Sequence, residues 1–340
     1  MEHFLPFIIS FSGIALFLAT VLGFISFSIS PKKYYLKGRH ILITGGSSGI
    51  GKAVAKLAAS MGSHVTIIAR SEKKLKEAVD EIRQSIPPCK GDECILQVIN
   101  WVSGDLAKGP KAVQAALQEV EKKAGMPVDV LVNSAGYSVP KAFKDLTPEE
   151  FEGMTRLNYL ASVDMTREVL PKMISSRKGG RIIFVSSQAG QTAVFGYTGY
   201  SPTKYAVRGF AEALQMEVHK YGIHIGVAFP PDTDTPGFEE ENKVKPEETH
   251  LVSESGSLFT PEQVAHSIVN GIIKGRFLIW TGFDGWLLCN LTAGMSPVFS
   301  VTDAFFQVTM ASLIRLVSFF YLVPWYLSVS KYKPKKEKDA

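Results

Sequence analysis

Apolar and polar positions between residues 39 and 281 follow a repeating order, a short apolar run and then a longer segment with helical periodicity. The short runs are continuous and rich in β-branched residues, which is typical of strands covered on both faces. Segments such as 73–83 (KKLKEAVDEIR) and 148–173 (PEEFEGMTRLNYLASVDMTREVLPKM) predict helices between them. Repeated alternation of strand and helix predicts an α/β fold, a doubly wound parallel sheet in a single domain over 38–281. The predicted strands are 40–44, 64–69, 94–99, 128–133, 181–186, 224–229 and 277–280.

The chain begins with a long apolar segment. Phe4 to Ser30 contain no charged side chain, and a helix needs about 20 such residues to cross a bilayer. A cleaved signal peptide is the competing interpretation, but the run is long, lacks a basic start and shows no clear cleavage site. We therefore expect a transmembrane anchor over 1–30. The basic cluster at 31–39 follows it, so the positive-inside tendency predicts that the rest of the chain lies on the cytosolic side.

A second apolar region lies near the C-terminus, from Trp286 to Ser330. Arg315 and Pro324 interrupt it, and an arginine at the centre of a span is costly. We expect residues 282–330 to associate with the membrane, and a re-entrant or interfacial hairpin is as consistent with the pattern as another span. A helix in a soluble core is the alternative. Residues 331–340 are expected to be a basic cytosolic tail, whose end, KEKDA, resembles a dilysine signal for retrieval to the endoplasmic reticulum.

Charge and cysteine content exclude several classes of function. The net charge of +5 comes from residues 31–39 and from the last ten residues, which leaves the stretch between them close to neutral. No basic groove is therefore expected, and we predict no nucleic-acid partner. The three cysteines, Cys89, Cys94 and Cys289, lack the spacing of a zinc site or a disulfide framework, so we predict no metal and a reducing compartment.

The first predicted strand runs directly into a glycine-rich segment, residues 44–52 (TGGSSGIGK). Glycines at such a turn let backbone N–H groups approach a pyrophosphate at the start of the following helix. The position between the first strand and the first helix is the one that a Rossmann-like dinucleotide site requires. The residues expected to contact the cofactor in this loop are Gly45, Ser47, Ser48, Gly49, Ile50 and Gly51.

The second strand ends at Arg70. An acidic residue there would bind the ribose 2′-hydroxyl of NAD, whereas a guanidinium suits the 2′-phosphate of NADP. Lys74, one helical turn later, reinforces that charge, so NADPH/NADP⁺ is the predicted cofactor. Asp105 follows the third strand and is expected to accept from the adenine amino group. Asn133 ends the fourth strand in the segment NSAG, where small residues leave room for the cofactor.

The pattern Tyr-x-x-x-Lys occurs three times, at Tyr137/Lys141, Tyr200/Lys204 and Tyr332/Lys336. Reduction of a carbonyl needs an acid that protonates the developing alkoxide, and a nearby ammonium favours the phenolate form of tyrosine. Only Tyr200/Lys204 follows a strand that ends in serines and precedes a helical segment. Either of those serines, Ser187 or its neighbour Ser186, has a hydroxyl suited to polarising the carbonyl.

These motifs resemble those of the short-chain dehydrogenase/reductase superfamily over about residues 38–280. The resemblance implies that Asn158, Ser187, Tyr200 and Lys204 form a catalytic tetrad and that Asn158 binds a water linking Lys204 to solvent. It also implies that the protein forms a homo-oligomer. Pro231 stands where the superfamily has a glycine, so the equivalent threonine is either Thr233 or Thr235.

The segments FVSSQAGQ, GFAEALQMEV and PPDTDTPGFEEENKVKPEET resemble one branch of the superfamily, the 3-ketodihydrosphingosine reductases. This resemblance implies NADPH-dependent reduction of a long-chain sphingoid ketone in the endoplasmic reticulum membrane. The acidic residues 239–241 then either attract the ammonium group of the substrate or belong to a solvated loop. A membrane-bound steroid or retinol dehydrogenase and an inactive lipid-binding protein remain the alternatives.

Overall fold

The computed structural model describes residues 31–88, 96–253, 256–298 and 300–331. The predicted anchor over 1–30, Cys89, Cys94 and nearly all of the basic tail lie outside the described residues. The predicted pair Tyr332/Lys336 lies outside them as well.

The core of the fold is one seven-stranded parallel sheet in the order β3-β2-β1-β4-β5-β6-β7. This arrangement confirms the predicted doubly wound α/β fold, which is Rossmann-like. The chain moves outward from β1 to β3 and then returns to lie beside β1 as β4. The topological switch point therefore lies between β1 and β4, where sheets of this kind bind ligands at the strands' carboxyl ends. The strands are β1 (His40–Thr44), β2 (His64–Ala69), β3 (Ile99–Ser103), β4 (Val130–Asn133), β5 (Gly180–Val185), β6 (Ile223–Phe229) and β7 (Leu278–Trp280).

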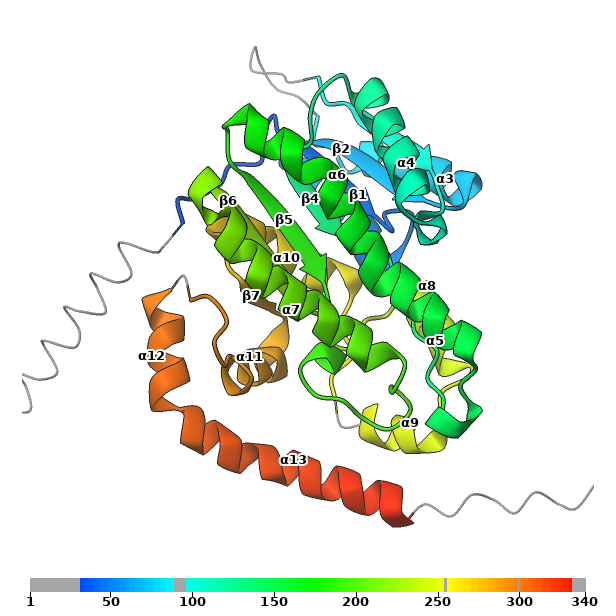
Figure 1. The fold of residues 1–340 in the computed structure, drawn as a ribbon, viewed down its shortest axis with the longest axis vertical. Helices are drawn as coiled ribbons and strands as arrows, with labels where there is room; N and C mark the ends of the chain where they lie inside the picture. Colours follow the sequence, from blue (N-terminus) through cyan, green and yellow to red (C-terminus); the bar gives the residue numbers. More distant parts are fainter. Residues whose placement is uncertain (1–30, 89–95, 254–255, 299, 332–340) are drawn as a thin grey trace, which may run out of the picture.

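Helices cover both faces of the sheet. On one face lie α4 (Pro110–Ala124), α6 (Ala161–Ser176) and α7 (Tyr200–Val218); on the other lie α2 (Gly49–Ser60), α3 (Glu72–Gln84) and α10 (Pro261–Lys274). Figure 1 shows α6 and α7 in front of the sheet and α10 behind it. Successive residues of a strand point to opposite faces, so Leu42 belongs to the first core, whereas Ile41 and Ile43 belong to the second.

The predicted position of the third strand was wrong. The structure places β3 at Ile99–Ser103, and residues 96–98 are not part of a strand. β3 is the edge of the sheet, and none of the described strands pairs with its outer side. Its sequence INWVS includes the polar Asn100 and the half-exposed Trp101. This mixed pattern indicates a buried strand less clearly than the apolar run before it, which is why the prediction was placed too early.

The long helical segment predicted over 148–173 is interrupted. It consists of α5 (Pro148–Thr155), a π-helical turn (Arg156–Leu160) and α6. Thr147 caps α5, because its hydroxyl accepts from the Glu150 amide while the Glu150 carboxylate accepts from the Thr147 amide. π-Turns inside α-helices are frequently found at functional sites, and this one contains Asn158.

Three helices follow β7: α11 (Gly282–Leu291), α12 (Val301–Thr309) and α13 (Ala311–Lys331). Within the described residues, one helix is long and apolar enough to cross a membrane, over Ala311–Ser330, with a mean hydropathy of 1.4. Only 11% of that apolar window is buried, so α13 lies on the surface of the described fold rather than in its core. Arg315 lies in its second turn rather than at its centre.

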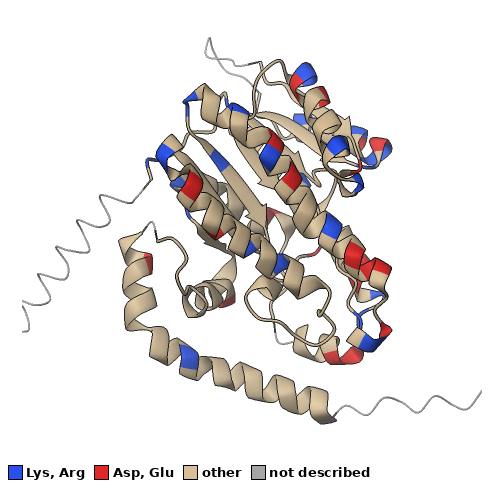
Figure 2. Ribbon diagram, in the orientation of Figure 1, with Lys and Arg blue, Asp and Glu red and all other residues tan. Residues whose placement is uncertain are grey.

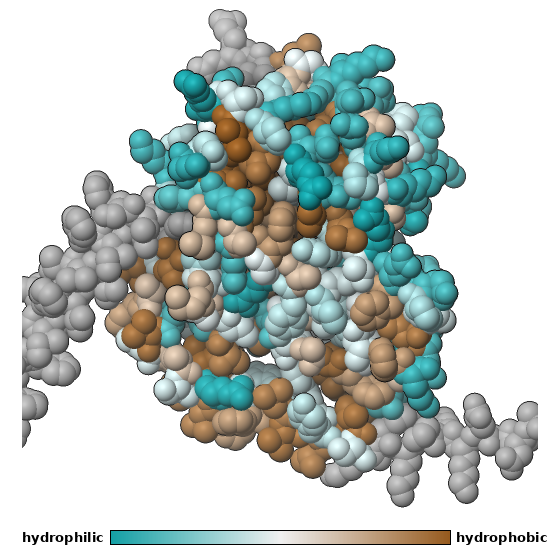
Figure 3. All heavy atoms as spheres, in the orientation of Figure 1, coloured by the Kyte–Doolittle hydropathy of each residue, from teal (hydrophilic) through white to brown (hydrophobic). Residues whose placement is uncertain are grey.

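The surface of α13 is strongly apolar. Figure 2 shows few charged residues on α12 and α13 compared with the helices around α3 to α5, and Figure 3 shows apolar atoms gathered along the edge that α13 forms. α13 packs against α11 and α9 (Glu247–Ser253), and it brings Trp325 to the rim of the main cleft. Its exposed apolar side chains are Leu313, Leu316, Phe319, Phe320, Tyr321, Val323, Tyr326 and Leu327.

Candidate active site

A cleft of about 550 Å³ opens at the carboxyl ends of the central strands, at the switch point of the sheet. Its walls come from the loops after β1, β2, β3, β4, β5 and β6 and from α8 (Pro236–Asn242). The cleft gathers nearly all of the sequence-predicted site residues. Those that line it are Gly45, Ser47, Ser48, Gly49, Ile50, Gly51, Arg70, Lys74, Asp105, Ser186, Ser187, Tyr200 and Lys204.

The glycine loop leaves no space for side chains. Gly45 has φ +70°, and a Cβ there would lie 2.9 Å from the Ala135 backbone. A Cβ at Gly51 would lie 2.5 Å from the Gly45 carbonyl oxygen. α2 begins at Gly49, the Ser48 side chain does not cap it, and its first turn contains no acidic residue. The first amides of α2 therefore face the cleft with the positive end of the helix, which fits the pyrophosphate of a dinucleotide.

Two basic residues lie at the end of β2. Arg70 is exposed where the strand ends, and Lys74 lies in the first turn of α3, whose N-cap is Ser71. Asp105 lines the same end of the cleft, although its carboxylate accepts a hydrogen bond from the Ala107 amide at 3.1 Å. This end of the cleft is therefore positively charged.

The structure does not bring Asn133 into the cleft. Its side chain is buried at the end of β4 and donates to the Thr166 hydroxyl on α6 at 3.3 Å. The next three residues, Ser134 to Gly136, line the cleft instead. Side chains alternate along a strand, and Asn133 points to the face that α6 covers.

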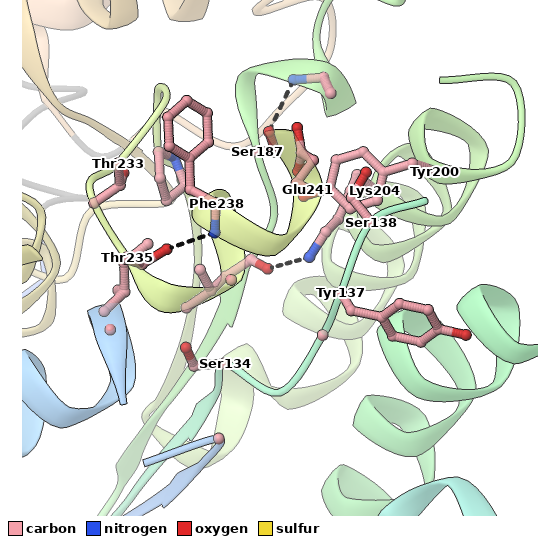
Figure 4. A pocket seen from close by; sticks show the side chains of 18 of the residues that line it. Ser134, Tyr137, Ser138, Ser187, Tyr200, Lys204, Thr233, Thr235, Phe238 and Glu241 are labelled. Atoms are coloured by element: carbon pink, nitrogen blue, oxygen red, sulfur yellow. Dashed lines mark hydrogen bonds between the residues drawn. The ribbon is translucent and has the colours of Figure 1, made fainter. Parts of the chain in front are cut away.

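Tyr200 and Lys204 lie at the start of α7, one helical turn apart. The Lys204 Nζ atom lies 5.5 Å from the centre of the Tyr200 ring and donates to the Val185 carbonyl oxygen at 3.0 Å. The Ser187 side chain lines the same cleft as Tyr200, and its hydroxyl oxygen accepts from the Ala189 amide at 3.1 Å. Figure 4 shows Ser187, Tyr200 and Lys204 converging in the cleft.

The two neighbouring serines have different surroundings. Ser186 is buried, and its hydroxyl donates to the backbone carbonyl of Lys204 at 3.0 Å. Ser187 is half-buried, and its hydroxyl lies beside the phenol of Tyr200. Ser186 therefore fixes α7 to the end of β5, whereas Ser187 is the serine available to a substrate carbonyl.

Burial has opposite effects on the two ionisable groups. It raises the pKa of Tyr200, the charge of Glu241 raises that pKa further, and the nearby Ser187 hydroxyl opposes both effects. Burial lowers the pKa of Lys204 from 10.5 to about 8. The expected lowering of the tyrosine pKa is outweighed here, because the phenol is enclosed and the ammonium is directed at Val185. Tyr200 therefore holds its proton at neutral pH, as a proton donor requires.

Asn158 lies behind the cleft rather than on its wall. Its side-chain amide donates to the Tyr137 carbonyl oxygen at 2.9 Å and to the Thr203 hydroxyl at 3.2 Å, and its oxygen accepts from the Tyr137 amide at 2.9 Å. A Cβ at Gly136 would lie 3.0 Å from that oxygen and 3.5 Å from the Lys204 Nζ atom. Asn158 thus holds the loop after β4 against Lys204.

The pair Tyr137/Lys141 has no such arrangement. Lys141 forms an ion pair with Glu150 at 2.5 Å, and the Tyr137 hydroxyl lies close to Gly153 on α5. Both threonines of the unusual segment after β6 line the cleft. Thr233 forms a bridge with Phe259, and Thr235 caps α8 and lies against Gly49 of the glycine loop.

Sequence analysis missed several polar residues of the cleft. Tyr197 lies one turn before Tyr200, with the two ring centres 5.5 Å apart, and its hydroxyl donates to Glu241 at 2.5 Å. Asp232 lines the same wall. The acidic run at 239–241 was the available signal, but sequence alone did not separate Glu241 from its two exposed neighbours.

Fold and cleft together define a class of protein: a doubly wound oxidoreductase that uses a nicotinamide cofactor. The model of the short chain dehydrogenase family matches residues 39–246, and the chain belongs to the short-chain dehydrogenase family.

Three curated relatives are similar over most of their length. The 3-dehydrosphinganine reductase of Danio rerio is 47% identical over 302 residues, or 89% of each chain. The 3-ketodihydrosphingosine reductase of Bos taurus is 46% identical over 294 residues, or 86% of each chain. A 3-dehydrosphinganine reductase of Arabidopsis thaliana is 38% identical over 330 residues, which is 96% of this chain and 95% of the relative.

Proposed function

We propose that this protein reduces 3-ketodihydrosphingosine to dihydrosphingosine with NADPH, a step of sphingolipid synthesis. The observation that carries the proposal is the convergence of Ser187, Tyr200 and the buried Lys204 in one cleft, as Figure 4 shows. The names and high identity of the relatives supply the substrate.

In the proposed reaction the substrate carbonyl oxygen lies between two hydroxyls. Ser187 donates a hydrogen bond to it and stabilises the negative charge that develops there. A bound nicotinamide cofactor supplies the hydride that the carbonyl carbon takes up. Tyr200 transfers its phenolic proton to the oxygen, which completes the alcohol. Lys204 stabilises the phenolate that remains, and Asn158 keeps the loop at Gly136 and Tyr137 in place.

We assign the cofactor as NADPH because of Arg70 and Lys74. A planar guanidinium binds a phosphate with two parallel hydrogen bonds, and a neighbouring ammonium adds to the attraction. Among the described residues, those that directly follow β2 and line the cleft are Arg70, Ser71 and Lys74, and none of them is acidic as selection of NADH would require.

We propose a membrane location from two segments. Residues 1–30 act as the transmembrane anchor, and residues 282–330 associate with the bilayer through the exposed face of α13. The domain over 38–281 then lies on the cytosolic side of the endoplasmic reticulum, with the tail 331–340. A ketone with a long alkyl chain partitions into lipid by about 0.8 kcal/mol per CH₂ group, so a catalytic cleft next to a membrane helix suits it.

The test is NADPH oxidation by the full-length protein in detergent. 3-Ketodihydrosphingosine, a ketosteroid and retinal serve as parallel substrates, each with NADPH and with NADH. The proposal predicts turnover of the sphingoid ketone with NADPH and far slower turnover of the others. Preference for the steroid or for retinal would refute the substrate, and NADPH binding without any turnover would indicate an inactive lipid-binding protein.

A further inference from the structure

The proposed substrate carries a positive charge very close to the reacting atoms. Its amino group is bonded to the carbon next to the ketone, so covalent geometry keeps the ammonium nitrogen within about 4 Å of the carbonyl oxygen. If that oxygen lies between Ser187 and Tyr200, the ammonium must lie beside Tyr200 as well. An enclosed ammonium needs an acceptor or a counter-charge there. This inference rests on the proposed function.

Glu241 is the acidic side chain in the right place. It lies in α8, lines the cleft and is only 15% exposed. It accepts the hydrogen bond from Tyr197, whose ring packs against that of Tyr200, and its charge acts on the pKa of the Tyr200 phenol. Figure 4 shows Glu241 in the cleft beside Ser187 and Tyr200.

The two acidic neighbours of Glu241 are not in the cleft. Glu239 and Glu240 are exposed, and Glu240 forms an ion pair with Lys243 on the surface of α8. Of the three acidic residues, the helix turns only Glu241 inward.

Glu241 is also held in a fixed position. The Lys245 Nζ atom lies 3.3 Å from its Oε1 atom and 4.6 Å from the centre of the Phe238 ring, and the lysine side chain is 1% exposed. Tyr197 donates to the same oxygen, Oε1. Among the residues that the structure describes, neither an ion pair nor a hydrogen bond is recorded for the other oxygen, Oε2, so the carboxylate keeps an acceptor for a ligand.

A second carboxylate strengthens the negative potential of this wall. Asp232 lines the cleft in the loop after β6, and burial raises its pKa while Lys245 lowers it. Lys245 is thus the cation that both carboxylates share. The other lysine of the cleft, Lys204, donates its hydrogen bond to the Val185 carbonyl oxygen rather than to either carboxylate.

We propose that Glu241, supported by Asp232, binds the 2-ammonium group of the substrate and makes the enzyme selective for α-amino ketones over ketones without an amino group. The carboxylate orients the substrate at the carbon next to the reacting one. A neutral N-acyl group at that position would lose the ion pair and add bulk, so the selectivity extends to the free base over its amides.

The ion pair also affects the chemistry. Glu241 raises the pKa of Tyr200, which makes the phenol a weaker acid. An ammonium bound to Glu241 offsets that charge, so the correct substrate makes Tyr200 a better proton donor.

The test compares 3-ketodihydrosphingosine with 1-hydroxyoctadecan-3-one, which has the same chain and ketone but no amino group. The measured quantity is the ratio of kcat/KM for the amino ketone to kcat/KM for the amine-free ketone. In Glu241→Gln we expect this ratio to fall roughly 10- to 100-fold, the range for loss of a charge-assisted hydrogen bond. The matched control Glu240→Gln removes an equal charge from the exposed side of α8 and should leave the ratio unchanged.

Lys245→Met provides a second variant, because it removes the cation that partly neutralises Glu241. The ratio should then rise, the opposite direction to Glu241→Gln. If NADPH binding shows that Glu241→Gln does not fold, the direction of the Lys245→Met change decides alone.

The outcomes separate the two proposals. If the wild-type protein reduces the amino ketone but Glu241→Gln keeps the wild-type ratio, the role of Glu241 is refuted and the proposed function stands. If Glu241→Gln lowers both kcat/KM values equally, Glu241 is structural and the inference is likewise wrong. If the wild-type protein reduces neither ketone, the proposed function fails first.

Discussion

The ammonium of Lys204 lies 5.5 Å from the centre of the Tyr200 ring, in a site that lowers its pKa from 10.5 to about 8. Enclosing this cation destabilises the folded state. The lowering of its pKa corresponds to a cost of about 3 kcal/mol in the free energy of unfolding. The role proposed for Lys204 therefore comes at a cost in stability, a conflict that is common in active sites.

Lys204→Met should abolish reduction and yet raise the free energy of unfolding at pH 7 by about 1–2 kcal/mol. The gain is smaller than the full cost of the charge, because the Val185 carbonyl loses its hydrogen bond. The folded-state pKa lies below the unfolded one, so the cost is fully present below pH 8 and disappears as pH rises toward 10.5. Urea denaturation of the wild type and of Lys204→Met at pH 7 and pH 10 measures the difference in the free energy of unfolding. A gain that is absent at pH 7, or larger at pH 10, would contradict this account.

Ser187 and Ser186 should respond differently to replacement by alanine. Ser187→Ala removes a hydrogen-bond donor to the developing oxyanion, so we expect kcat/KM to fall roughly 10²- to 10³-fold. It also removes the acceptor of the Ala189 amide, which should cost about 1 kcal/mol of stability. Ser186→Ala loses the bond to the Lys204 carbonyl and should cost about 1 kcal/mol of stability, with the smaller loss of activity. Steady-state kinetics and thermal unfolding of both variants distinguish the roles, and the reverse pattern would exchange the assignments.

Arg70→Glu should weaken NADPH binding roughly 10- to 100-fold, because it replaces a charge-assisted phosphate contact with repulsion. NADH, which lacks the 2′-phosphate, should lose far less affinity. Lys73→Glu is the matched control, since Lys73 is exposed on α3 and does not line the cleft. Fluorescence titration with both cofactors gives the affinities. Equal losses for NADPH and NADH would show that Arg70 does not recognise the phosphate.

The exposed face of α13 should contact lipid. Tyr326 is 73% exposed on α13, and Met216 is 82% exposed on α7. In liposomes that contain brominated phospholipid, the tryptophan added by Tyr326→Trp should be strongly quenched and the one added by Met216→Trp should not. Equal quenching at the two sites would argue against membrane contact through α13.

The sequence predicted the parts of this protein whose physical causes are local. Continuous apolar runs identified the central strands because those strands are covered on both faces. The glycine loop was predictable because its place between β1 and α2 is required by the chemistry of phosphate binding. β3 was misplaced because an edge strand does not need an unbroken apolar pattern.

The remaining features depend on which way a side chain points in the folded chain. Along the sequence, Asn133 lies at a strand end where contact with a cofactor is expected. Because side chains alternate between the two faces of β4, the Asn133 side chain points toward α6 instead. Glu241 differs from Glu240 only by its place on a helix whose orientation the sequence did not give. The side chain of Lys245 is only 1% exposed, which is unusual for lysine. Its burial depends on how the residues after α8 pack in three dimensions, which the sequence did not indicate.

The central claim is that Tyr200 protonates the alkoxide of a sphingoid ketone. The most direct measurement compares NADPH oxidation and formation of dihydrosphingosine by the wild-type protein, Tyr200→Phe and the control Tyr205→Phe, whose tyrosine is exposed on the same helix. We expect equal amounts of NADPH consumed and product formed in the wild type and in Tyr205→Phe. In Tyr200→Phe we expect unchanged NADPH binding and a rate lower by about 10²- to 10⁴-fold. Wild-type turnover that survives in Tyr200→Phe would contradict the account.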